Sequence, residues 1–149
     1  MHIVLVEPQI PQNTGNIARL CAITQSELHL VKPLGFETTN YYLRRAGLDY
    51  WDKVRPVFHD SFESFWKDHQ ADRCWFASTK ATTFYTQARF QEGDYLIFGN
   101  ETHGLPEPFI FSHPQMGLTI PMWNDTRSLN LSNAVAIILY EALRQVKGF

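Results

Sequence analysis

Three polar segments of this 149-residue chain carry residues that could do chemistry, and each follows a short apolar run. The first reads EPQIPQNTGNIARL and places Arg19 just inside a helical pattern that Asn13 or Thr14 can cap. An arginine close to a helix amino terminus is electrostatically unfavourable unless an anion lies near both. We therefore expect Arg19 to meet a phosphate, and an ion pair with Glu7 or Glu101 is the alternative.

The second segment reads YLIFGNETHGLP, a strand pattern that runs into a glycine turn. Gly99 and Gly104 have the spacing that opens a P-loop, but Leu105 and Pro106 stand where Lys and Ser or Thr belong. No G-x-G-x-x-G fingerprint is present either, so both nucleoside triphosphate hydrolysis and an ordinary dinucleotide fold are disfavoured. The remaining interpretation is a turn whose backbone binds a nucleoside, with Glu101 either orienting a substrate or capping the next helical turn.

The third segment reads TIPMWNDTRSLNLSNAVAIILYEA. A strand ends at Ile120, a polar loop holds Arg127, Ser128 and Asn130, and Asn130 or Ser132 caps a long helix. Capping alone accounts for each polar residue taken singly. Three strand-to-helix loops rich in Gly, Asn, Ser and Arg nevertheless predict one composite pocket at the carboxyl edge of a parallel sheet.

The elements that must position these loops alternate between short apolar runs and longer amphipathic stretches, which predicts a parallel-sheet α/β fold in a single domain, residues 1–149. The expected strands are Ile3–Val6, Leu28–Val31, Val54–Phe58, Cys74–Ala77, Tyr95–Phe98 and Leu118–Ile120. The expected helices are Asn16–Gln25, Tyr41–Ala46, Phe62–His69, Glu107–Phe111 and Ser132–Val146.

The last expected helix is apolar almost all round. One face carries Val135, Ile138, Leu139, Ala142 and Val146, and a second carries Ala134, Ile137 and Glu141. A helix buried on two sides needs two partners. The sheet is one, and the other is either a second subunit or the rest of the same chain.

Composition describes a folded, soluble protein, with 44% hydrophobic and 19% charged residues. Cys21 and Cys74 form no C-x-x-C pair and are expected to be small buried residues, and no His pair has the spacing of a zinc-binding helix. No leader-like or membrane-spanning apolar run is present, so we expect a cytoplasmic protein without membrane contact.

The formal net charge of −2 gives no general reason to expect nucleic acid, so RNA would need a local basic patch. Candidates for that patch are Arg19, Lys32, Arg44, Arg45, Lys53, Arg55 and Lys80. A solvated surface of mixed charge is the equally plain alternative.

In this order and spacing, NTGNIAR, FGNETHGLP and IPMWNDTRSLNLSNAVAIILYEA resemble the three motifs of the SPOUT superfamily of RNA methyltransferases. The similarity is greatest to small bacterial members that 2′-O-methylate the wobble nucleotide of leucine tRNAs. It includes LRRAGLDYWD and so covers essentially the whole chain. The resemblance implies an α/β fold with a carboxyl-terminal trefoil knot, a homodimer, S-adenosylmethionine bound by the knot, no metal, and a tRNA anticodon stem-loop as substrate.

Carried over by motif, the implied cofactor contacts, made largely through backbone, are Ala77, Ser78, Gly99, Glu101, Ile120, Met122, Ser128, Leu129 and Asn133. The sequence departs from the family at Asn100 and His103, where relatives often carry Pro and Arg, on the side of that loop that faces RNA.

Arg19 would serve RNA binding and catalysis by gripping a phosphate and polarising the 2′-hydroxyl. Its guanidinium stays protonated, so the general base is left open. Tyr140 and Asn133 are secondary catalytic candidates, with packing and capping as their alternative roles. Two rival functions remain: methylation of rRNA or another tRNA position, and noncatalytic RNA binding.

Overall fold

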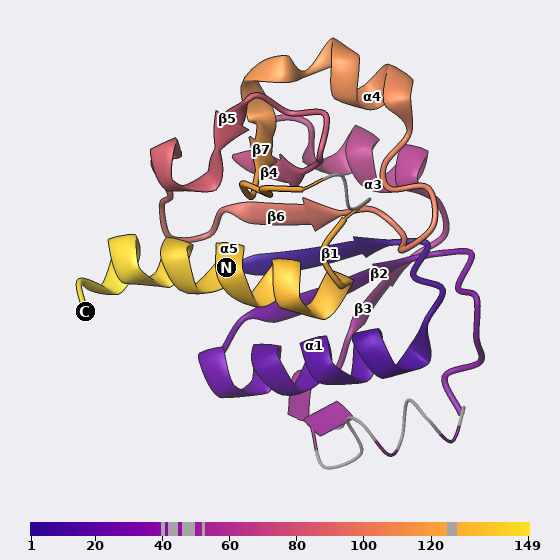
Figure 1. The fold of residues 1–149 in the computed structure, drawn as a ribbon. Coiled ribbons are helices and arrows are strands. Elements are labelled where there is room, and N and C mark those ends of the chain that lie inside the picture. The colour runs from indigo at the N-terminus through magenta and orange to yellow at the C-terminus, as the bar shows by residue number, and fades with distance from the viewer. Residues whose placement is uncertain (40, 42–44, 46–49, 52, 125–127) are drawn as a thin grey trace.

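The computed structural model describes residues 1–39, 41, 45, 50–51, 53–124 and 128–149. Its centre is a seven-stranded sheet in the order β3-β2-β1-β6-β4-β7-β5 (Figure 1), and every paired neighbour is parallel. The strands are β1 (His2–Val6), β2 (Glu27–Val31), β3 (Val57–His59), β4 (Cys74–Ala77), β5 (Thr83–Phe84), β6 (Tyr95–Phe98) and β7 (Gly117–Thr119). The predicted parallel α/β architecture is confirmed.

Helices cover both faces of this sheet (Figure 1). α1 (Pro11–Thr24) and α5 (Leu131–Lys147) pack on one face, and α3 (Phe62–His69) and α4 (Glu107–Ser112) pack on the other. Two short 3₁₀ turns, η1 (Tyr85–Gln87) and η2 (Pro114–Met116), lie in the connections. No helix in the described ranges has the length and apolarity needed to cross a bilayer.

Strand β1 shows why the central strands read as unbroken apolar runs. Ile3 and Leu5 join the core under α1 and α5, while Val4 and Val6 join the core under α3 and α4. All four side chains are buried because successive residues of a strand point to opposite faces, and both faces are covered.

Helix α1 begins five residues earlier than the expected Asn16. Pro11 occupies its first turn, where a fixed φ and a missing N–H cost nothing. The residue before it, Ile10, makes no side-chain cap. Asn13 and Thr14 lie inside the helix and are buried, so the prediction that either one caps α1 was wrong.

The expected strand Val54–Phe58 also differs, because β3 starts only at Val57. The Arg55 backbone N–H donates to the Trp51 carbonyl at 3.0 Å, and Arg55 takes a φ of 47°, so a helical turn occupies the start of the expected strand. The two-residue β5 was not predicted. The expected helix Tyr41–Ala46, with Arg44, falls mostly outside the described residues, as does most of LRRAGLDYWD.

Helix α5 begins as predicted at an asparagine cap. The Asn130 carboxamide oxygen accepts from the backbone N–H groups of Ser132 at 2.9 Å and Asn133 at 3.4 Å. The predicted core face is buried except Val146, which is half-buried, and the second face (Ala134, Ile137 and Glu141) is half-buried.

Both cysteines are buried and free, as predicted. Burial raises the pKa of each thiol to about 12, which leaves the thiols protonated and unreactive.

Candidate functional site

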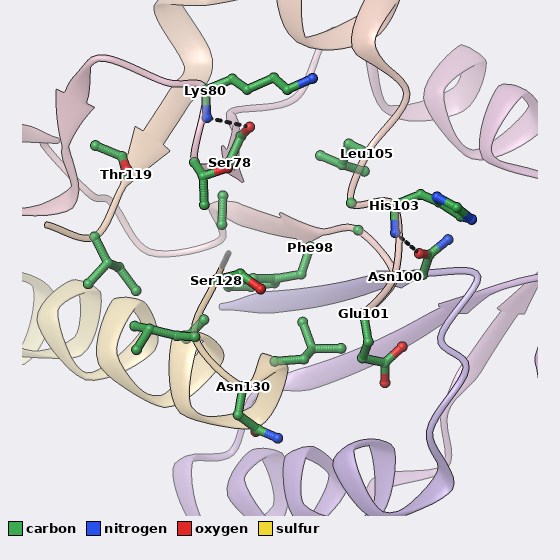
Figure 2. A pocket seen from close by; sticks show the side chains of 18 of the residues that line it. Ser78, Lys80, Phe98, Asn100, Glu101, His103, Leu105, Thr119, Ser128 and Asn130 are labelled. Atoms are coloured by element: carbon green, nitrogen blue, oxygen red, sulfur yellow. Dashed lines mark hydrogen bonds between the residues drawn. The ribbon is translucent and has the colours of Figure 1, made fainter. Parts of the chain in front are cut away.

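A cavity of about 600 Å³ lies at the carboxyl ends of β4, β6 and β7 (Figure 2). Its walls come from residues 77–80 at the end of β4, 98–105 at the end of β6, 118–120 and 122 at the end of β7, and 128–131 at the start of α5. Ile10 and Asn13 add the start of α1. All three polar segments therefore meet at the predicted edge of the sheet, where parallel α/β sheets bind their ligands.

Eight of the nine predicted cofactor contacts line this cavity: Ala77, Ser78, Gly99, Glu101, Ile120, Met122, Ser128 and Leu129. Asn133 does not, because it is exposed on the first turn of α5. Their binding role stays a prediction. Further wall residues were not among the predicted cofactor contacts; they include Thr79, Lys80, Thr119, Leu131 and Ala134. Thr79 and Lys80 directly follow the predicted contact Ser78, and the other three lie within the third polar segment; this nearness in sequence was the one available signal.

The turn after β6 is held by its own backbone. A Cβ atom on Gly99 would lie 2.1 Å from the Gly104 carbonyl carbon and 2.2 Å from the Leu105 nitrogen. Gly104 has a φ of +70° and donates its N–H to the Asn100 carbonyl at 3.0 Å. Gly99 is thus required by the turn itself, rather than only by the approach of a ligand as its motif position indicated.

The Asn100 side chain stabilises the same turn. Its carboxamide oxygen accepts the Thr102 N–H at 3.1 Å and the His103 N–H at 2.7 Å (Figure 2). The departure from the family at this position therefore has a structural role. His103 itself is exposed at the mouth of the cavity.

Glu101 ties the second segment to the first. Its carboxylate accepts the backbone N–H of Gln9 at 2.8 Å, the N–H of Ile10 at 3.1 Å and the Asn13 side-chain amide at 3.0 Å. The prediction that Glu101 caps the helical turn following it was wrong, because these bonds go to the amino terminus of α1. A carboxylate is favourable there, since the helix dipole is positive at that end.

Asn13 continues this network to the third segment. Its carboxamide oxygen accepts the Asn130 amide at 3.0 Å, and Asn130 in turn caps α5. The chain of bonds from Glu101 through Asn13 to Asn130 joins the turn after β6, helix α1 and the cap of α5. It fixes the three polar segments relative to one another and so shapes the cavity.

Lys80 sits on the opposite wall. Its backbone N–H donates to the Ser78 hydroxyl at 3.1 Å (Figure 2), and its ammonium pairs with Glu107. Lys32 similarly pairs with Asp60 at 3.0 Å. These two members of the predicted basic patch are therefore partly neutralised by neighbouring acids.

Arg19 does not line the cavity. It is exposed in the middle of α1, where its guanidinium carbon lies 5.5 Å from the centre of the Tyr50 ring. Arg19 is too far from the amino terminus of α1 to feel its charge, because α1 starts at Pro11 and the terminal charge fades within one turn. The alternative fails too, since Arg19 forms no ion pair with any described residue.

A second cation approaches the same ring, because the Lys53 ammonium lies 5.7 Å from the centre of Tyr50. Arg19 and Lys53 therefore form a small exposed basic surface beside an aromatic ring.

Tyr140, another catalytic candidate, is 44% exposed on α5 and does not line the cavity. Arg127 lies outside the described residues.

Fold and cavity together define a parallel α/β protein with a binding site built from strand-to-helix loops. The profile of the SpoU rRNA Methylase family matches residues 1–140. A tRNA (cytidine(34)-2′-O)-methyltransferase from Saccharophagus degradans is 49% identical over 99% of this chain and 96% of that protein. One from Escherichia coli K12 is 45% identical over 98% of this chain and 94% of that protein.

Solved structures agree with this similarity. One, described as giving structural insights into the 2-OH methylation of C/U34 on tRNA, has a TM-score of 0.93 at 46% identity, covering 99% of this chain and 97% of that one. An AdoMet-bound rRNA methyltransferase from Sinorhizobium meliloti, at 22% identity, has a TM-score of 0.85 over 96% of this chain and 55% of that one, and shares the fold. The chain belongs to the SpoU methylase family, and the SPOUT resemblance is confirmed.

Proposed function

We propose that this protein transfers a methyl group from S-adenosylmethionine to the 2′-hydroxyl of the wobble nucleotide, cytidine or uridine 34, in leucine tRNAs. The observation that carries the proposal is the composite cavity. The three segments that resemble SPOUT motifs converge on it, in a chain that is similar over nearly its full length to enzymes named tRNA (cytidine(34)-2′-O)-methyltransferase.

The cavity suits this cofactor in size and chemistry. Its volume of about 600 Å³ is in the range of sites for ligands of this size. Phe98, Leu118 and Leu131 offer apolar wall for an adenine ring, and the backbone of the turn at Gly99 offers polar groups for the ribose and amino acid ends. The bound cofactor would supply the electrophilic methyl group, without need of a metal.

The RNA side would be served by the exposed basic surface. Arg19 would hold a phosphate beside the target ribose in its planar fork and polarise the 2′-hydroxyl. In-line transfer depends above all on this positioning. The proton leaves the hydroxyl to a phosphate, water or another side chain, because an arginine is not a base at ordinary pH.

The finer architecture is also part of the proposal. We expect residues 1–149 to act as one domain in the cytoplasm, and the chain between β7 and α5 to thread a loop as a trefoil knot, an exception to ordinary topology. The order of elements supports the knot, because β7 pairs with β4 and β5, whereas α5, the next helix along the chain, lies beside α1 (Figure 1).

A homodimer through α1 and α5 completes the proposal. Ile23 on α1 and Tyr140 on α5 are large exposed side chains that a partner would bury. Ile138, which the apolar pattern also singled out, is 2% exposed inside its own chain, so charging it would test folding rather than assembly. Arg19 lies outside the cavity of its own chain. In a dimer, it could instead serve the cavity of the partner subunit.

Light scattering tests the dimer, with an expected mass of twice 17.3 kDa. Tyr140→Glu and Ile23→Glu should each shift the population toward monomer, whereas Phe111→Glu, at a more exposed residue on α4, should not. A wild-type mass of one chain at micromolar concentration would contradict the proposed dimer.

Nucleoside mass spectrometry tests the activity. RNA from cells lacking the protein should lose 2′-O-methylation at position 34 of leucine tRNAs and regain it on complementation. Loss of 2′-O-methylation from rRNA or from another tRNA position instead would establish the rival function of methylating that RNA. Binding of both cofactor and anticodon stem-loop without any methyl transfer would establish the noncatalytic one.

A further inference from the structure

A cluster of imidazoles lies at the edge of the sheet opposite the cavity. His2 is the first residue of β1, and its register partner on β2 is Glu27, also a first residue. His29 stands two residues further along β2, on the face covered by α3, where it packs against Phe65. His59 on β3 and His69 on α3 complete the cluster.

Three atoms of this cluster converge on one point. His2 Nδ1 lies 3.1 Å from His29 Nε2 and 3.2 Å from a Glu27 carboxylate oxygen, and His29 Nε2 lies 3.6 Å from that oxygen. Ligands bound tetrahedrally to zinc at about 2.0–2.1 Å are separated by about 3.3 Å. The three atoms already stand at the separations of three corners of such a site.

We propose that His2 Nδ1, His29 Nε2 and the Glu27 carboxylate bind a divalent transition-metal ion of the zinc type, with the fourth position open to water. Two imidazoles and one carboxylate are a donor set that zinc accepts. Calcium and magnesium are disfavoured because they prefer oxygen ligands throughout.

The rings are held in the orientation that this site needs. His29 directs its other nitrogen, Nδ1, at His59 Nε2 at 3.0 Å, so an Nδ1–H can donate there and leave Nε2 free for the ion. The His2 ring stacks on Tyr95 with centroids 4.2 Å apart and planes 9° apart. Burial lowers the pKa of His29 to about 3, which keeps its ring neutral at neutral pH.

An ion can reach this position from solvent. The Glu27 side chain is 64% exposed, the His2 side chain 23% and the His29 side chain 6%, so the carboxylate forms the open side and His29 the floor. Without an ion, His2 Nδ1 and His29 Nε2 share one hydrogen bond. A bound metal would replace that bond with two metal–nitrogen bonds.

The site is independent of methyl transfer. It lies at the amino ends of β1 and β2, whereas the cavity lies beyond the carboxyl end of β6. From His2 to the end of β1 is about 13 Å at roughly 3.3 Å per residue. The expected role is structural, a link between the first residues of two neighbouring strands.

Titration calorimetry on the full-length protein, without a histidine tag and freed of metal with EDTA, tests the proposal with ZnCl₂. We expect one ion per chain and a melting temperature that rises with zinc. Titration with CoCl₂ should give the strong visible absorption of four-coordinate cobalt. No cofactor or RNA is needed, so the outcome is separable from the proposed function.

Two variants assign the ligands. His2→Phe keeps the stacking on Tyr95 but removes the nitrogen, and Glu27→Gln removes the charge of an exposed side chain with little effect on folding. Each should weaken zinc binding at least tenfold, while Glu92→Gln, an exposed acid outside the cluster, should not. Absence of zinc binding by the wild type, or wild-type affinity in Glu27→Gln and in folded His2→Phe, would overturn the proposal.

Discussion

At the carboxyl ends of the central strands the polar groups belong to loops, whereas at the amino ends they project from the strands or directly precede them. At the cavity edge, the bonds from Glu101 through Asn13 to Asn130 link the turn after β6, the first turn of α1 and the cap of α5. The opposite edge holds the imidazole cluster and Asp94, a fully buried carboxylate next to β6.

Asp94 shows what that second edge does. Its carboxylate accepts Arg73 Nε at 2.8 Å, the Trp75 indole N–H at 2.9 Å and the Gln91 backbone N–H at 2.9 Å. Those partners lie within 21 residues of it, whereas Glu101 reaches back 88 to 92 residues. The amino edge therefore stabilises the sheet, and the carboxyl edge assembles distant loops into a site.

The largest expected effect tests the stabilising edge. Asp94→Ala should lower the free energy of unfolding by about 3 kcal/mol, because it removes a fully buried carboxylate that accepts from three donors, one of them a cation. Urea unfolding measures the change. The control is Asp60→Ala, which removes an exposed partner of Lys32 and should cost under about 1 kcal/mol. Equal losses in the two variants would contradict the distinction between buried and exposed pairs.

Glu101→Gln tests the edge that assembles the site. We expect a loss of about 2 kcal/mol in the free energy of unfolding, since the charged acceptor of three donors is replaced by a neutral one. Cofactor affinity should fall together with stability, because the network shapes the cavity. Glu107→Gln, which breaks only the surface pair with Lys80, is the matched control. Unchanged stability and cofactor affinity in Glu101→Gln would show that the network is dispensable.

Arg19→Ala tests RNA binding at a residue that belongs to neither edge of the sheet. Methyl transfer to an anticodon stem-loop should fall at least about tenfold, equal to roughly 1.4 kcal/mol, with folding and cofactor affinity nearly unchanged. Lysine should rescue only part of the rate, because it lacks the planar fork. Arg89→Ala removes another exposed arginine and should leave the rate intact. A lower melting temperature with full activity per folded molecule would make Arg19 a structural residue.

The smallest expected effect concerns Trp123, which is 92% exposed beside Met122 at the cavity. An exposed indole next to a ligand site is a platform on which a base can stack. Trp123→Ala should raise the KM for the stem-loop about fivefold, equal to about 1 kcal/mol, with kcat little changed. Phe111→Ala, on α4, is the control. A fall in kcat alone would argue against stacking in the ground state.

The two edges also differ in how far the sequence predicted them. The carboxyl edge was foreseen because its residues lie in continuous motifs, each placed directly after an apolar strand pattern. Asn130 was one of two residues predicted to cap the last helix, and it caps α5. The site proposed at His2, Glu27 and His29 left no such pattern, because His2 and His29 lie 27 residues apart on two strands.

By itself, the sequence determined the alternation of strands and helices, the burial of β1 on both faces and the family. These follow from local periodicity and from motifs that are contiguous in the chain. Only the tertiary structure decided that Glu101 meets the start of α1, that Arg19 lies outside its own cavity, and that His2, Glu27 and His29 share one point. Such relations depend on strand register and helix boundaries, which pair residues far apart in the chain and leave no local pattern.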